Sequence, residues 1–168
     1  MALFQERGYD AVNVGHIAEA AKVSVPTFYA HYASKEEIVL PVPPAETMAA
    51  FLAEHDSALP VGERIRRATP FWLASFGPVE RAELLDRWRV VASNPALRIR
   101  AGEYERATAA RILSGLPSGP GGLSTADKLH VAAYLAAFTE TFLTWADGNG
   151  EGKLEEIADQ AFDALQGM

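Results

Sequence analysis

Cysteine is absent from the 168 residues of the sequence. Disulfide bonds, catalysis by a thiolate and metal sites built on cysteine are therefore excluded. The histidines do not take over the metal-binding role, because they are scattered along the chain without the spacing of metal ligands. We therefore expect no metal and no other cofactor. The four histidines are His16, His31, His55 and His130.

Long hydrophobic runs are missing as well. A membrane-spanning helix needs about eighteen apolar residues free of charge, and the sequence has no such run. The start, MALFQERGYD, carries charges and lacks the basic first region of a secretory signal. Hydrophobic residues nevertheless make up 49% of the chain, which is enough for a folded core. These features predict a soluble cytoplasmic protein with no membrane partner.

The signatures of common catalytic sites are also absent. Serine and histidine occur without a nucleophile elbow, and no glycine-rich phosphate loop follows a strand pattern. Glu103 and Glu105 are two positions apart in a helical pattern, so they cannot face one site. We predict that the protein is not an enzyme.

Positive charge is scarce. The chain has 15 lysines and arginines against 22 aspartates and glutamates, a formal net charge of −7. Up to position 35 the cations are Arg7, Lys22 and Lys35. Since neutralisation of phosphates supplies most non-specific affinity for nucleic acid, binding over the whole surface is disfavoured, and only a local contact face remains possible.

Three helix starts follow one another within residues 12–38, VNVGHIAEAAKVSVPTFYAHYASKEEI. Asn13, Ser24 and Ser34 belong to the residue types preferred at N-caps, and Ser34 with Glu37 has the spacing of a capping box. The three predicted helices are joined by short turns. A helix, a tight turn and a second helix with exposed N-terminal residues form the arrangement of a helix-turn-helix.

The helix that starts at Ser24 has distinct inner and outer faces. Phe28 and Tyr32 lie four positions apart and are expected to point inward. The residues expected to point outward or sideways are Val25, Thr27, Tyr29 and Ala30.

The segment ALFQERGYDAVNVGHIAEAAKVSVPTFYAHYASKEEI resembles the DNA-binding domain of TetR-family transcriptional regulators. The match includes the Gly-Tyr turn, the IAEAA helix, the VS turn, the TFYAHY recognition helix and the SKEE start of the next helix. The resemblance implies an all-α protein with a helix-turn-helix domain over 1–41, whose first helix is truncated, and a helical ligand-binding and dimerisation domain over 42–168. It also implies a homodimer that binds a palindromic double-stranded DNA operator as a repressor and is released by a small-molecule effector.

Positions in the family motif also imply which residues contact DNA. Apart from the motif, Tyr29 would be an ordinary packing residue, and His31 and Lys35 ordinary surface residues. Lys22 occupies the place of the glycine often found before VS, so that turn has to accept a side chain. The expected DNA contacts are Asn13, Ser24, Val25, Pro26, Thr27, Tyr29, Ala30, His31 and Lys35.

The prolines of the segment PVPP, residues 41–44, end the helix begun near Ser34 at Val39 or Leu40. We place the domain boundary there. Further helical patterns cover approximately 45–55, 61–76, 78–93, 95–115, 125–147 and 152–166, and GLPSGPGGLS is expected to be a loop.

Aromatic residues are the candidates for an effector site in the larger domain. An aromatic lining with few charges favours a small apolar or amphipathic ligand. Such residues also form ordinary cores, and that alternative stays open. Arginines 87, 89, 98 and 100 can either meet an acidic group of the ligand or serve as surface charge. The expected lining residues are Phe71, Trp72, Phe76, Trp88, Tyr104, Tyr134 and Phe138.

The last two predicted helices are the candidates for a homodimer interface. The helix over 125–147 is apolar on more than one face, so one face can bury the protein's own core while another meets a partner. A monomeric bundle that buries these faces internally is the alternative. The scarcity of cations also motivates a second functional reading, a TetR-like helical dimer that binds a ligand or a protein partner without tight binding to DNA.

Overall fold

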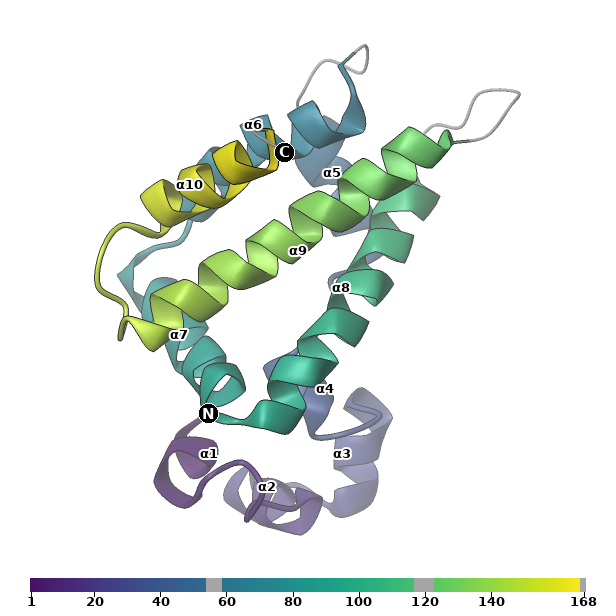
Figure 1. The fold of residues 1–168 in the computed structure, drawn as a ribbon. Coiled ribbons are helices and arrows are strands. Elements are labelled where there is room, and N and C mark those ends of the chain that lie inside the picture. The colour runs from purple at the N-terminus through teal and green to yellow at the C-terminus, as the bar shows by residue number, and fades with distance from the viewer. Residues whose placement is uncertain (54–58, 117–122, 167–168) are drawn as a thin grey trace.

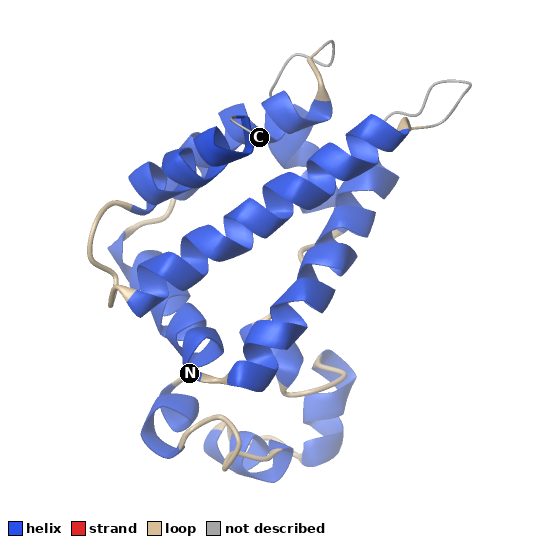
Figure 2. Ribbon diagram, viewed as in Figure 1, coloured by secondary structure: helices blue, strands red, loops and turns tan. Residues whose placement is uncertain are grey.

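The computed structural model describes residues 1–53, 59–116 and 123–166. Within these ranges every regular element is an α-helix (Figures 1 and 2), so the predicted all-α class is confirmed. The loop predicted at 115–124 and the end of the helix predicted over 45–55 lie mostly outside the described residues.

Four short helices form an N-terminal unit: α1 (Ala2–Arg7), α2 (Val14–Ala20), α3 (Val25–His31) and α4 (Glu36–Val39). Figure 1 shows this unit at one end of the molecule, next to the ends of α7 and α8. Its small core includes Phe4 and Tyr9, whose ring centroids are 5.2 Å apart. A core of this size depends on well-closed helix ends, because helices this short are unstable alone.

The predicted caps close α2 and α3. Asn13 Oδ1 accepts a hydrogen bond from the N–H of His16 at 2.9 Å, and His16 Nδ1 accepts one from the N–H of Asn13 at 3.3 Å. Ser24 Oγ accepts from the N–H of Thr27 at 3.1 Å. Both caps satisfy N–H groups that have no partner inside their helix.

The capping box predicted for Ser34 and Glu37 is wrong. The helix begins only at Glu36, with Lys35 in the cap position and no side-chain cap. Glu37 instead reaches back one residue further, and its carboxylate accepts a hydrogen bond from the N–H of Ala33 at 2.7 Å. The end of this helix at Val39 is as predicted.

Six longer helices follow among the described residues, close to the predicted ranges. They are α5 (Ala45–Ala53), α6 (Val61–Ala74), α7 (Pro78–Ser93), α8 (Pro95–Gly115), α9 (Thr125–Asp147) and α10 (Leu154–Gln166). α9 is central and packs against α6, α7, α8 and α10. Figure 1 shows it running between α8 and α10.

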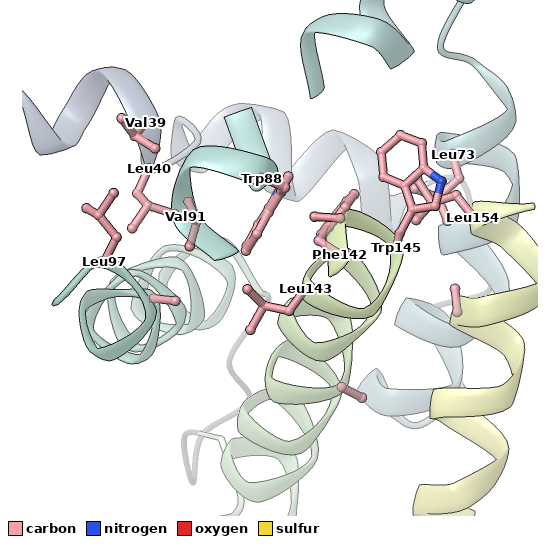
Figure 3. Close-up of a cluster of buried hydrophobic side chains, with 14 of the residues drawn as sticks. Val39, Leu40, Leu73, Trp88, Val91, Leu97, Phe142, Leu143, Trp145 and Leu154 are labelled. Atoms are coloured by element: carbon pink, nitrogen blue, oxygen red, sulfur yellow. The ribbon is translucent and has the colours of Figure 1, made fainter. Parts of the chain in front are cut away.

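The hydrophobic core is continuous between the two parts of the chain (Figure 3). Trp88 of α7 and Phe142 of α9 stack with their ring centroids 4.9 Å apart and an interplanar angle of 9°. Val39 and Leu40, at the end of α4, belong to the same buried cluster as Val91. The end of α4 is thus packed into the core of the longer helices. The PVPP segment, at which we place the domain boundary, therefore does not separate the two cores.

A polar contact also joins the two parts. The side chain of Asn94, between α7 and α8, donates a hydrogen bond to Asp10 Oδ2 at 3.1 Å. Asn94 Oδ1 accepts from the N–H of Leu97 at 3.1 Å and so caps α8. One amide therefore fixes both the start of α8 and the loop between α1 and α2.

Candidate nucleic-acid interface and effector cavity

α3 presents most of its residues to solvent. Val25 is 40% exposed and Tyr29 is 54% exposed, whereas Phe28 is buried. Phe28 packs edge-to-face against Tyr29, with ring centroids 5.4 Å apart. Pro26, Thr27, Ala30 and His31 are exposed as well. The outward direction predicted for this face is therefore confirmed.

Tyr32 does not point inward as predicted, since it is 41% exposed. α3 ends at His31, and Tyr32 takes an extended conformation with φ −135° and ψ 128°. The four-residue helical spacing from Phe28 therefore does not apply to it. Its ring still contacts Phe28, with centroids 5.5 Å apart.

A shallow surface hollow lies between the start of α2 and the front of α3. Four residues predicted to contact DNA line it, and they come from three separate segments of the chain. Gly15 also lines the hollow, and a side chain there would approach Asn13 Oδ1 to 3.1 Å. The four predicted residues in its lining are Asn13, Val25, Tyr29 and Lys35.

Ser24 and Thr27 are hydrogen-bonded to each other. The two hydroxyl oxygens are 2.7 Å apart, and Ser24 Oγ also accepts from the N–H of Thr27. A hydroxyl carries one donor and two acceptor sites. Thr27 therefore keeps capacity for a further polar contact, while the first role of Ser24 is to cap α3.

Lys35 has a structural role that its sequence position did not predict. Its ammonium group donates hydrogen bonds to the carbonyl oxygens of Tyr9 at 3.0 Å and Val12 at 2.9 Å. The same group lies 4.1 Å from the centroid of the Tyr9 ring. An ammonium has three donors, and these two carbonyls take two of them. The half-buried lysine thus ties α4 to the loop between α1 and α2.

A tyrosine and a carboxylate add to this junction. Burial raises the pKa of Tyr9, and the neighbouring carboxylate of Glu36 raises it further. Burial alone would also raise the pKa of Glu36, but the nearby polar groups of Ser34, its own backbone and Tyr9 favour the charged carboxylate and lower the pKa. The carboxylate therefore stays ionised beside a neutral phenol at neutral pH.

Lys22 adopts a left-handed conformation with φ 57°. The turn before Val23 therefore does accept a side chain in place of glycine, as the sequence requires. It does so in a conformation that is strained for any residue other than glycine. A non-glycine residue in this region costs about 1 kcal/mol. The lysine side chain remains exposed beside the turn.

Two adjoining cavities lie among the longer helices. The inner cavity, with a volume of about 80 Å³, is bordered by α5, α6, α8 and α9. The outer cavity, with a volume of about 440 Å³, reaches the segment between α4 and α5. The residues that line both cavities are Pro43, Trp72, Tyr104 and Phe138.

Six of the seven aromatic residues predicted to line an effector site lie on these cavities. Tyr134 lines the inner cavity, and Phe76 and Trp88 line the outer cavity, in addition to the three aromatics shared by both. Phe71 lines neither, because it is 72% exposed. It precedes Trp72 by one position, and one helical step turns a side chain by about 100°. The placement of Phe71 in the cavity is therefore corrected.

Sequence reasoning missed the buried threonines of the inner cavity. Thr69, Thr108 and Thr139 are at most 5% exposed. Thr69 donates to the carbonyl of Ile65 at 2.8 Å. The signal in the sequence was faint: Tyr104, Thr108 and Ile112 repeat every four residues along α8, so a hydroxyl interrupts an apolar stripe. The other missed lining residues include Phe51, Ile65, Ile112, Leu135 and Pro43.

The described residues contain no helix long and apolar enough to cross a membrane. They also contain no group of three histidine, aspartate or glutamate side chains placed to hold a metal ion.

The capped helix α2 is followed by a tight turn and by the short, exposed helix α3, and this arrangement defines a helix-turn-helix protein. The longer helices that follow enclose an apolar cavity. Residues 1–42 match the family model described as bacterial regulatory proteins, tetR family. The chain belongs to this family.

A curated relative extends the similarity beyond the N-terminal unit. The chain is 32% identical over 126 residues to the HTH-type transcriptional regulator TcmR of Streptomyces glaucescens. The alignment covers 68% of this chain and 55% of TcmR, so this chain spans about half the length of that relative.

Proposed function

We propose that the protein is a transcriptional regulator that binds a palindromic DNA operator as a homodimer, with α3 in the major groove. The exposure of Val25 and Tyr29 at the front of α3 is the observation that carries this proposal. The name of the relative TcmR, a transcriptional regulator, agrees with it. In this proposal the protein acts as a repressor and leaves the operator when a small apolar or amphipathic effector fills the cavities.

The residues of α3 suit apolar contacts with bases more than bidentate hydrogen bonding. Val25, Pro26 and the methyl group of Thr27 can contact thymine methyl groups, and Tyr29 can reach a base or a phosphate. The N–H groups of Val14 and Gly15, which the Asn13 cap does not use, and the remaining donor of Lys35 can bind phosphates. With so few cations, the salt dependence of binding is shallow, since each phosphate contact adds about −0.9 to the slope.

The exposed face of α9 is the best-supported dimer surface. Leu129 is 64% exposed, and Ala132 and Ala136 are exposed on the same face one and two turns further on. Small residues allow a second helix to approach closely. The apolar stripe of α10 is less available than the sequence suggested, because Leu154 and Phe162 are already buried within the chain. We therefore propose that α9 dominates the interface and that α10 flanks it.

The segment between α4 and α5 supports a link between effector and DNA. Pro43 lines both cavities, while Val39 and Leu40 line the outer cavity and are buried at the end of α4. A molecule in the cavity therefore touches the chain directly after the N-terminal unit. If this segment has two conformations, an effector that binds one of them better shifts the population toward it and so changes the spacing of the α3 helices in the dimer. Because the coupling is reciprocal, operator DNA must weaken effector binding by the same factor.

Fluorescence anisotropy with the DNA upstream of the protein's own coding sequence tests the proposal. Wild-type protein is expected to bind this DNA in preference to a scrambled duplex. Replacing Tyr29 by Ala should remove the preference, whereas Val79→Ala, at a residue 68% exposed on α7, should leave it intact. Unchanged operator affinity in the Tyr29 variant contradicts the assignment of α3.

A second candidate function is a helical dimer that binds a ligand or a protein partner without tight binding to DNA. It is favoured by the charge of residues 1–41, which contain three cations (Arg7, Lys22 and Lys35) and five carboxylates. Absence of DNA binding at low salt, together with an intact dimer, supports this second candidate over the first.

A further inference from the structure

Arg87 of α7 stands out among the residues of the outer cavity. It is half-buried and lines the cavity together with Trp72, Tyr104 and Phe142. Its Nε atom is shielded from solvent and has no hydrogen-bond partner among the described residues. A shielded N–H group without a hydrogen-bond partner is costly, and a negative group that accepts a hydrogen bond from it recovers that cost.

The other half-buried arginines of the described chain have carboxylate partners. Arg66 pairs with Asp163 at 2.6 Å, and Arg81 pairs with Glu155. Arg89 is 3.7 Å from Asp86 and donates to the carbonyl of Asn149. Arg87 makes no ion pair with any described carboxylate, although Glu83 is one helical turn away at a suitable spacing.

The carboxylates around the cavities define where a negative group can bind. Glu80 and Glu83 line the outer cavity but are exposed, so water and salt screen them. Glu80 also folds back toward the start of α7, where a side chain on Gly77 would lie 2.6 Å from its Oε2. Glu105 is the charged residue in the lining of the inner cavity. A negative group is therefore repelled from the inner cavity and attracted to Arg87.

We propose that the effector is an anionic amphipathic molecule, with an oxyanion such as a carboxylate or sulfonate paired with Arg87 and an aromatic body against Trp72 and Phe138. The proposal rests on the proposed function, since it takes these cavities as the effector site. The planar guanidinium offers a two-pronged set of donors that matches an oxyanion. The rings of Trp72 and Phe138, with centroids 5.4 Å apart, supply the apolar contact surface.

Tyr104 is placed to assist Arg87. Burial raises the pKa of its phenol, against smaller opposing effects from Thr108 and Arg87. The phenol is therefore neutral and can donate a hydrogen bond at physiological pH. Tyr104 lines both cavities and so lies where the charged and apolar parts of such a ligand meet.

A matched pair of fluorescent probes tests the charge requirement. 8-Anilinonaphthalene-1-sulfonate and N-phenyl-1-naphthylamine share one aromatic skeleton and differ in the sulfonate. Replacing Arg87 by Gln is expected to weaken binding of the sulfonate probe about tenfold, because a hydrogen bond to a charged group is lost. Binding of the neutral probe should change less than about twofold, since its apolar contacts remain.

Three controls separate recognition from folding. Arg87→Lys should restore part of the sulfonate affinity, and Arg106→Gln, at an exposed residue of α8, should leave both probes unaffected. Trp72→Ala should weaken both probes. Equal weakening of both probes by Arg87→Gln, or no weakening of the sulfonate probe, overturns the inference, as does failure of wild-type protein to bind either probe.

The operator assay keeps the two proposals distinguishable. Operator binding by wild-type protein together with charge-independent probe binding rejects the anionic effector and leaves the regulator intact. If wild-type protein shows no preference for operator DNA, but Arg87→Gln selectively weakens binding of the sulfonate probe, the proposed function as a DNA-binding regulator is rejected. The anion site at Arg87 is then still supported.

Discussion

The ammonium group of Lys35 lies over the ring of Tyr9 and donates to that residue's own carbonyl oxygen. Replacing Lys35 by Met removes this contact and the hydrogen bond to Val12. We expect the free energy of unfolding to fall by about 1–3 kcal/mol, the range for hydrogen bonds to charged groups. Urea denaturation measures this loss, and Lys128→Met, at an exposed position of α9, is the matched control. Equal stability of the two variants contradicts the structural role of Lys35.

The strained turn at Lys22 predicts a stabilising substitution. Lys22→Gly removes the side-chain clash of the left-handed conformation, but it also loosens the unfolded chain. The expected net gain in unfolding free energy is about 0.5 kcal/mol. The control is Ala20→Gly in the exposed last turn of α2, which should destabilise by up to about 1 kcal/mol. Thermal unfolding should therefore shift in opposite directions for the two glycine variants.

The prediction from sequence was accurate where local chemistry decides the structure. Asn13 and Ser24 cap the helices that follow them, and the PVPP segment ends α4 where expected. The structural role of Lys35 cannot be predicted in this way, because its partners Tyr9 and Val12 are 26 and 23 positions away in the chain. No local pattern contains that contact.

The cavity shows a second limit of sequence reasoning. Aromatic character singles out Trp72 and Tyr104, which line both cavities. Residue type does not tell which faces of different helices meet, so it also selects the exposed Phe71 and passes over Thr108, which lines the inner cavity. The unpaired state of Arg87 also depends on where every nearby carboxylate lies, which only the three-dimensional structure reveals.

The ion pair between Arg81 of α7 and Glu155 of α10 predicts a pH-dependent contribution to stability. The hydrogen bond from Arg81 lowers the pKa of Glu155 against the opposing effect of burial. Because the folded pKa is below the unfolded value, the contribution is present above the unfolded pKa of about 4.3 and is lost as the pH falls through the folded pKa.

Glu155→Gln should therefore reduce the free energy of unfolding by about 1 kcal/mol at pH 7. The difference from wild type should shrink in strongly acidic buffer, as the pH falls through the lowered pKa of the folded state and the native carboxylate becomes protonated. Urea denaturation at both pH values measures it. Glu156→Gln, which removes an exposed pair with Lys153, should have almost no effect at either pH. A loss at Glu155 that is the same at both pH values contradicts the electrostatic origin.

The proposed dimer surface can be tested by placing a charge on it. Ala132→Glu and Ala136→Glu should each shift the protein toward the monomer, because an ionised carboxylate would be buried against the partner copy. Ala110→Glu, on the exposed face of α8, should leave the assembly unchanged. Sedimentation velocity over a range of concentrations reads the assembly directly. An unchanged sedimentation coefficient in all three variants rejects α9 as the interface.

The absence of native cysteine makes the central claim, that the front of α3 enters DNA, directly measurable. A single thiol introduced by Val25→Cys should react readily with a maleimide in the free protein, since this position is 40% exposed. Saturating operator DNA should slow that reaction at least about tenfold, while the thiol of Val79→Cys on α7 should react at the same rate with and without DNA. Equal reactivity of the Val25→Cys thiol in the free protein and in the DNA complex contradicts the account.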